Sequence, residues 1–201
     1  MIDVASLDRV AAYRLLTTAL VPRPVAWVGT VSADGRTNLA PFSYFMGVST
    51  EPLRVAFSAA RARGPDGAPV RKDTAQNLLA TGLCTISIPE QKDLDAMHAT
   101  SASWPGSEFD AVGIEAVRGT IVAAPRPANA RVSMEGRLDQ HLDLGQVDLF
   151  LVEILGVHVA PELLTAAGTV DAAGFDPVAR LGGELYATLG DRIPRAPARV
   201  P

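Results

Sequence analysis

The chain has 201 residues, and 48% of them are hydrophobic, which is enough for one domain with a substantial core. Its net charge of −4 comes from 18 basic and 22 acidic residues spread along the whole chain. This pattern excludes a basic nucleic-acid footprint and a polybasic membrane patch, so we expect no nucleic acid and no membrane among its partners.

The chain has a single cysteine, Cys84, which excludes an internal disulfide. In its apolar surroundings we expect this thiol to be buried and to behave as a small hydrophobic side chain. The N-terminus lacks the basic start and the apolar run of a signal peptide, and no stretch reaches the ~18 apolar residues of a membrane span. We therefore expect a cytoplasmic location.

The N-terminal segment predicts a short helix over residues 6–19, in which Ser6 can cap the first turn and apolar residues recur at helical spacing. A Pro-Arg-Pro segment at 22–24 then forces an extended entry into a strand over 25–32. Apolar residues occupy both faces of this strand, so it should be buried, with Trp27 in the core.

A tight turn at Asp34-Gly35 joins this strand to a second one, which is interrupted by Asn38, Pro41 and Ser43. Proline cannot donate a ladder hydrogen bond, so it belongs at a sheet edge or at a bulge. The second strand should therefore leave backbone groups free to contact a ligand.

Basic side chains concentrate in the segment 59–72, which follows a predicted strand over 53–58. The segment is too long and too rich in glycine and proline for a simple hairpin turn, and such loops are often functional. A short helix over 74–81 follows, with Asp73 or Thr74 as its cap and Gly82 as its end. Cations beside the free N–H groups of a helix N-terminus can form a phosphate-sized anion site. The basic residues are Arg61, Arg63, Arg71 and Lys72.

The rest of the chain continues with strands, short helices and loops. We predict strands over 83–88, 132–140 and 147–159, a helix over 93–99, an aromatic-containing loop over 100–113, and a short helix that starts at Asp176-Pro177 and stops at Gly182-Gly183. The end of the chain is too rich in proline and arginine to assume folded structure. We therefore predict one domain over 1–190 and a tail over 191–201.

About six or seven strands follow one another with short helices between them. Long helices do not alternate with the strands, which favours a mainly β antiparallel barrel over a doubly wound sheet. The mouth of such a barrel is a place where loops can hold a ligand.

Familiar nucleotide-loop, zinc and hydrolase motifs are missing from the sequence. His98, His141 and His158 lack metal-ligand spacing, so no metal site is expected. A solvated cluster is the ordinary explanation of the loop arginines considered alone. Together with the helix start and the interrupted strand, they favour a site for a phosphorylated planar cofactor.

Seven short segments and one tyrosine together indicate a resemblance to a known protein family. They are PRPVAWV (22–28), DGRTNLAPFSYF (34–45), EPL (51–53), KDTAQN (72–77), MHATS (97–101), GVHV (156–159), RLGG (180–183) and Tyr186. In this order they resemble the flavin reductase-like, FMN-binding split-barrel family, and its flavoredoxin-type branch in particular. The resemblance spans nearly the whole chain.

The resemblance implies a homodimer of six-stranded antiparallel split barrels with FMN bound near the subunit interface. It implies that the ring and ribityl chain of FMN contact Thr30, Asn38, Ala40, Pro41 and Ser43. It implies that the phosphate end is held by Ser58, Arg61, Arg63, Lys72, Asp73 and Thr74, although the carboxylate of Asp73 repels phosphate and would act by capping the helix or orienting a cation. It places His158 near the nicotinamide or the flavin, as the candidate catalytic residue.

The expected activity is that of an FMN-dependent oxidoreductase, in which NADH or NADPH passes a hydride to flavin and electrons then reach free flavin, a partner protein or another acceptor. Three alternatives stay open. The protein could be a flavoredoxin-like electron carrier without its own NAD(P)H activity, a pyridoxamine-phosphate-oxidase-like enzyme, or a barrel without flavin that serves as a dimeric interaction module.

Overall fold

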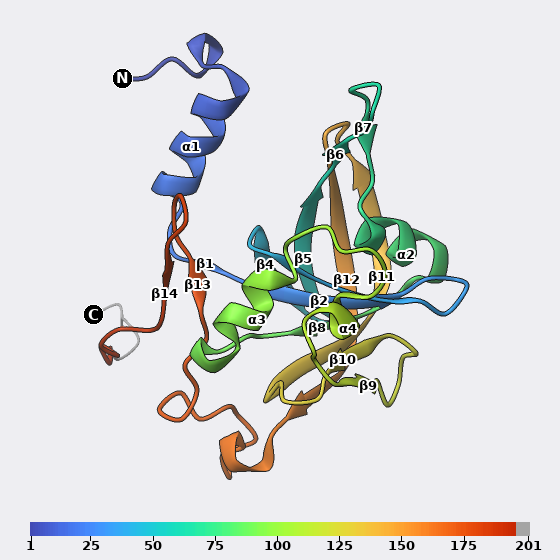
Figure 1. The fold of residues 1–201 in the computed structure, drawn as a ribbon. Helices are drawn as coiled ribbons and strands as arrows, with labels where there is room; N and C mark the ends of the chain where they lie inside the picture. The colour runs from blue at the N-terminus through green and yellow to red at the C-terminus, as the bar shows by residue number, and fades with distance from the viewer. Residues whose placement is uncertain (196–201) are drawn as a thin grey trace.

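A seven-stranded antiparallel sheet dominates the computed structural model, which describes residues 1–195 (Figure 1). Its strands are β2 (Ala26–Val31), β3 (Thr37–Phe42), β4 (Phe45–Thr50), β5 (Leu53–Ala60), β8 (Leu83–Ser87), β11 (Val132–Asp143) and β12 (Val147–Val159). Their order across the sheet is β3-β2-β8-β11-β12-β5-β4. The mainly β, split-barrel class is confirmed, with seven strands in the main sheet where the resemblance implied six.

The sheet must curl, because its two edge strands, β3 and β4, follow each other in the chain. Only Ser43 and Tyr44 connect them, so the two edges lie within about 11 Å of each other at this point. The Ser58 N–H donates to the Tyr44 carbonyl at 3.0 Å, and the ring centroids of Phe42 and Phe57 are 5.2 Å apart. The result is a barrel that is split between β3 and β4.

Two hydrophobic clusters support this sheet. The first fills the barrel and includes Phe57, Ile86 and Phe150, all fully buried. The second lies on the other side of β2 and β3 and packs them against α3 (Leu94–Ala99) and α4 (Glu108–Ala111). Trp27 belongs to the second cluster with 1% of its surface exposed, which confirms its predicted core position.

Helix α1 (Arg9–Ala19) stands away from the barrel (Figure 1). Thr17 is its one buried residue. Asp8 caps the helix by accepting the Ala11 N–H at 2.7 Å, so the predicted cap at Ser6 is wrong. Ser6 instead ends a 3₁₀ turn, η1 (Val4–Ser6), that precedes the helix.

A three-stranded sheet of β1 (Arg23–Pro24), β13 (Ala179–Arg180) and β14 (Tyr186–Ala187) lies at the C-terminal end of α1 (Figure 1). The buried guanidinium of Arg23 donates to the carbonyls of Thr17 and Leu20 at 2.7 and 2.6 Å. A cation at the C-terminal end of a helix is favourable, because the last carbonyl groups have no partner in the helix. Arg23 therefore ties α1 to this sheet.

Helix α2 (Asp73–Thr81) buries Ala75 and Leu78 in the barrel core and ends at Gly82, which has a φ of +71°. This ending is as predicted. Its N-cap position is Lys72, not Asp73 or Thr74, and no side chain caps it. The preceding segment is also more regular than predicted, because β6 (Ala62–Arg63) and β7 (Pro69–Val70) pair as a ribbon around a turn at Gly67.

The predicted helix that starts at Asp176-Pro177 is wrong. The segment contains β13, in which Arg180 pairs with Arg23 on one side and with Tyr186 on the other. The local start and stop signals were suitable for a helix, but pairing with a strand far away in the chain decides the structure. The predicted loop over 100–113 contains the one-turn helix α4.

The remaining elements are η2 (Gln91–Asp93), β9 (Ala116–Arg118), β10 (Pro125–Pro127) and η3 (Pro161–Leu163). None of the helices over residues 1–195 has the length and apolar character that crossing a bilayer requires. Residues 196–201 of the predicted tail lie outside the described residues.

Candidate functional site

A groove runs along the outer edge of β3, which has a hydrogen-bonded neighbour strand on one side only. The groove consists of three adjoining cavities of about 180, 190 and 200 Å³, which we call the α2 end, the middle and the β13 end. The α2 end and the middle share Lys72, and the middle and the β13 end share Pro41 and Ser43. The predicted position of Pro41 on an edge strand is confirmed.

The groove brings together most of the residues that the sequence suggested. Asn38, Ala40, Lys72, Asp73 and Thr74 line the α2 end, while Pro41, Ser43 and Ser58 line the middle together with Lys72. Thr30 lies behind the groove and is fully buried. The structure therefore places residues from β3, from the end of β5 and from the start of α2 along one continuous surface.

A buried hydrogen-bond network fixes the start of α2 against β3. The Asn38 amide donates to Thr30 Oγ1 at 3.2 Å and to Thr74 Oγ1 at 2.8 Å. The Asn77 amide donates to Thr30 Oγ1 at 3.1 Å. All four side chains are buried, so breaking one contact would leave a desolvated polar group. Asn38 and Thr30 thus position the first turn of α2 relative to the strand edge.

The α2 end offers positive charge and N–H donors. The first N–H groups of a helix have no partner within the helix, and Lys72 stands directly before them. Glu108 lies in the same cavity, where its carboxylate accepts the Leu39 N–H at 3.0 Å. Burial raises the pKa of Glu108, and the charge of Asp73 adds to this increase. The cavity therefore combines the ammonium group of Lys72 and the N–H donors of α2 with the carboxyl groups of Asp73 and Glu108.

Two of the four loop cations face an acidic cluster and do not line the groove. The guanidinium of Arg61 binds both oxygens of Asp148, at 2.8 and 2.6 Å, and Arg71 reaches Asp148 at 3.1 Å. Asp143 contacts both arginines, and His141 Nε2 lies 2.8 Å from Asp148. The hydrogen bond from Arg61 is the main reason why the pKa of Asp148 lies well below its usual value.

Two further predicted site residues, Arg63 and His158, also lie outside the groove. Arg63 is exposed on β6, next to Ala62, which does line the α2 end. His158 is exposed on β12, where it pairs across from Ser133. Partial burial and the nearby charge of Arg126 lower the pKa of His158. Within one chain, His158 and the groove are therefore separate.

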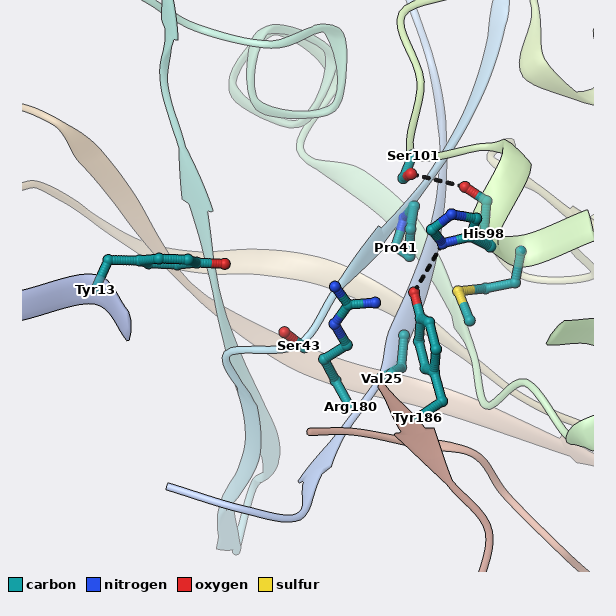
Figure 2. Close-up of a pocket in the computed structure, with 9 residues that line it drawn as sticks. Tyr13, Val25, Pro41, Ser43, His98, Ser101, Arg180 and Tyr186 are labelled. Carbon is teal, nitrogen blue, oxygen red and sulfur yellow. Dashed lines mark hydrogen bonds between the residues drawn. The ribbon is translucent and has the colours of Figure 1, made fainter. Parts of the chain in front are cut away.

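The β13 end brings together polar and aromatic side chains to which the sequence analysis assigned no role. Figure 2 shows Tyr13, His98, Arg180 and Tyr186 arranged around this cavity together with Ser43 and Pro41. His98, Arg180 and Tyr186 fall in segments that carry the family resemblance, but nothing in their local spacing indicates that they meet. Glu108 was missed because the sequence of the 100–113 segment has no regular pattern.

The chain matches known proteins over most of its length. The sequence model described as "Flavin reductase like domain" matches residues 18–175. An uncharacterised protein from Deinococcus radiodurans is 36% identical over 90% of this chain and 82% of that protein. An uncharacterised protein from Halalkalibacterium halodurans is 31% identical over 92% of this chain and 90% of its own length.

Solved structures give the same result. Nitrilotriacetate monooxygenase component B from Bacillus cereus is 29% identical, with a TM-score of 0.89 over 97% of this chain and 98% of that chain. The 2-nitrobenzoate 2-nitroreductase NbaA from Pseudomonas fluorescens is 25% identical, with a TM-score of 0.91 over 100% of this chain and 98% of that chain. Its sequence, its split barrel and these matches agree: the chain belongs to the flavin reductase-like family.

Proposed function

We propose that the protein is an FMN-dependent oxidoreductase. The observation that carries the proposal is the continuous groove along β3, whose α2 end holds Lys72 beside the first N–H groups of α2. Among the similar structures, a monooxygenase component and a nitroreductase are redox proteins by name, which supports the same reaction class. When bound, FMN would take a hydride from NADH or NADPH and pass electrons to free flavin or to a protein acceptor.

The residues of the groove fit a phosphorylated planar group. Lys72 and the first turn of α2 supply the charge and the donors that a phosphate needs. Pro41 has no N–H and Ala40 has a small side chain, so a flat ring could lie against the edge of β3. The Asn38–Thr74 hydrogen bond of 2.8 Å keeps these two parts at a fixed separation.

The remaining predicted residues take less direct roles in this proposal. Arg63 would supply a second positive charge for the phosphate, because it neighbours Ala62, which lines the α2 end. Arg61 acts indirectly, since its guanidinium is bound to Asp148 and anchors the segment before Lys72. A catalytic role for His158 requires the groove of a second subunit.

A second copy of the chain is the proposed partner, and α1 and β4 form the proposed contact surface. Leu16 of α1, Leu20 directly after it and Met46 of β4 are 50%, 54% and 61% exposed, and they line a mainly apolar cavity of about 370 Å³. Ser58 lines both this cavity and the middle of the groove, so a partner seated here would border the flavin site. Light scattering should give twice the chain mass of 21.1 kDa, and a monomer mass would contradict the dimer.

The test of the function is the visible spectrum of FMN-supplemented, desalted protein under anaerobic conditions, before and after NADH or NADPH is added. Retained flavin bands that bleach support the oxidoreductase. Bands that persist with both donors support the electron carrier, and colourless protein that fails to bind added FMN contradicts the flavin site. Product analysis after incubation with pyridoxine phosphate tests the oxidase-like alternative.

The cytoplasm is the proposed location. Cys84 is the one cysteine of the chain and is fully buried, so the fold does not depend on an oxidising compartment.

A further inference from the structure

The β13 end of the groove combines an arginine with aromatic walls. Its lining residues come from segments far apart in the chain: Tyr13 from α1, Ser43 from the end of β3, His98 from α3, Arg180 from β13 and Tyr186 from β14. In Figure 2, the Arg180 guanidinium and the Tyr13 hydroxyl both point into the space between these elements. The cavity measures about 200 Å³.

Arg180 differs from the arginines that the fold uses for its own stability. Arg61 and Arg71 are bound to carboxylates, and Arg23 is bound to carbonyl groups at the end of α1. Over residues 1–195, by contrast, no carboxylate lies within ion-pair distance of Arg180, whose guanidinium donates one hydrogen bond, to the Gly183 carbonyl at 2.6 Å. Several of its N–H donors remain available.

The guanidinium is held in place by the residues around it. Arg180 and Tyr186 are cross-strand partners, and the guanidinium carbon lies 4.4 Å from the centroid of the Tyr186 ring. The Tyr186 hydroxyl is in turn 3.1 Å from His98 Nδ1, and Ser101 Oγ donates to the His98 carbonyl at 2.6 Å. A cation that is already oriented loses little side-chain freedom when it binds an anion.

We infer that the β13 end is a binding site for a small planar organic carboxylate. The Arg180 fork matches a carboxylate in geometry and charge, and the rings of Tyr13 and Tyr186 with Pro41 offer flat apolar surface for the body of the ligand. A cavity of about 200 Å³ is smaller than the roughly 300–1,000 Å³ of sites for larger ligands, so it suits one ring and not a whole dinucleotide.

The position of this site relative to the flavin rests on the proposed function. Pro41 and Ser43 line both the middle of the groove and the β13 end. A carboxylate held by Arg180 would therefore lie beside a ring bound along β3. The carboxylate site itself depends only on this chain's residues, so it can be tested without flavin.

The experiment is a calorimetric titration of flavin-free protein with benzoate and with benzamide, its neutral counterpart. We expect the native protein to prefer benzoate. Arg180→Gln should weaken benzoate binding by about ten-fold or more, the effect of losing a charge-assisted hydrogen bond, and should leave benzamide binding within about two-fold. Arg118→Gln removes the same charge from an exposed position on β9 and should change neither affinity.

A native protein that binds benzoate no better than benzamide, or an Arg180→Gln variant with unchanged benzoate affinity, would overturn the inference. Near-ultraviolet circular dichroism shows whether Arg180→Gln folds, and if it does not, Tyr186→Phe is used in its place. This variant keeps the ring under the guanidinium but releases His98, so benzoate binding should weaken and benzamide binding should not. An FMN titration of the same samples separates the proposals, because FMN binding without benzoate binding contradicts only the carboxylate site.

Discussion

Asp148→Asn tests whether two of the four loop cations, Arg61 and Arg71, serve an acidic cluster and not the groove. The Asp148 side chain is fully buried and lies against Arg61, Arg71 and His141. The substitution removes its negative charge while leaving the shape of the side chain nearly unchanged. Arg61, with 11% of its side chain exposed, then keeps only the half-exposed Asp143 as a counter-charge.

The expected loss of folding free energy is about 3 kcal/mol. Breaking a buried ion pair by removing one partner costs about 3–5 kcal/mol, and the lower end applies because Asp143 continues to neutralise the arginines. The matched control is Asp139→Asn, which removes one carboxylate from an exposed pair with Arg54. A pair of that kind contributes about 0–1 kcal/mol.

The measurement is urea unfolding of flavin-free protein at fixed protein concentration, because bound ligand or subunit association would shift the midpoint. The hydrogen bond from Arg61 lowers the pKa of Asp148, so its contribution is present above the unfolded pKa of about 3.9 and is lost as the pH falls towards the folded value. The gap between native protein and Asp148→Asn should shrink below about pH 4. Equal midpoints for the two asparagine variants would refute this account of the cluster.

Three further results are expected. Lys72→Ala combined with Arg63→Ala should weaken FMN binding by at least about ten-fold and leave the unfolding midpoint unchanged. The control, Lys92→Ala combined with Arg118→Ala, removes two positive charges elsewhere and should leave FMN binding unchanged. An FMN titration checks both pairs. Cys84, whose pKa burial raises to about 12, should react with a disulfide reagent only after denaturant is added, and rapid reaction in the native protein would contradict its burial. Glu135→Gln should lower stability by about 1–2 kcal/mol in urea unfolding, because the carboxylate accepts the N–H groups of Thr120, Ile121 and Val122 at distances of 2.6 to 2.8 Å.

The strands were predictable because their signals are local. The predicted strand over 147–159 coincides with β12 (Val147–Val159), and the Asp34-Gly35 turn has the expected positive φ at Gly35, of 89°. Pro41 indicated an edge strand because a missing N–H cannot be tolerated between two neighbours. Each of these conclusions depends on residues a few positions apart.

The errors arose where distant residues decide the outcome. The sequence around Arg180 has helix-like start and stop signals, but its strand pairs with Arg23, over 150 residues earlier. Likewise, no local pattern shows that Arg61 and Arg71 meet Asp148, because the two arginines flank the β6–β7 ribbon whereas Asp148 lies on β12, more than 70 residues further along the chain. The sequence shows that the cations cluster along the chain, but their partners could not be assigned from spacing.

The distribution of cations restricts what the groove can bind. Two cations line the groove within the described chain, Lys72 at the α2 end and Arg180 at the β13 end. Over residues 1–195, neither has a carboxylate within ion-pair distance. The polar but uncharged β3 edge, with Pro41 and Ser43, separates them. A single anion could neutralise only one of these cations. The arrangement therefore favours two anionic groups at opposite ends of a flat ligand surface, which is what a flavin phosphate at α2 and a separate carboxylate at β13 would provide.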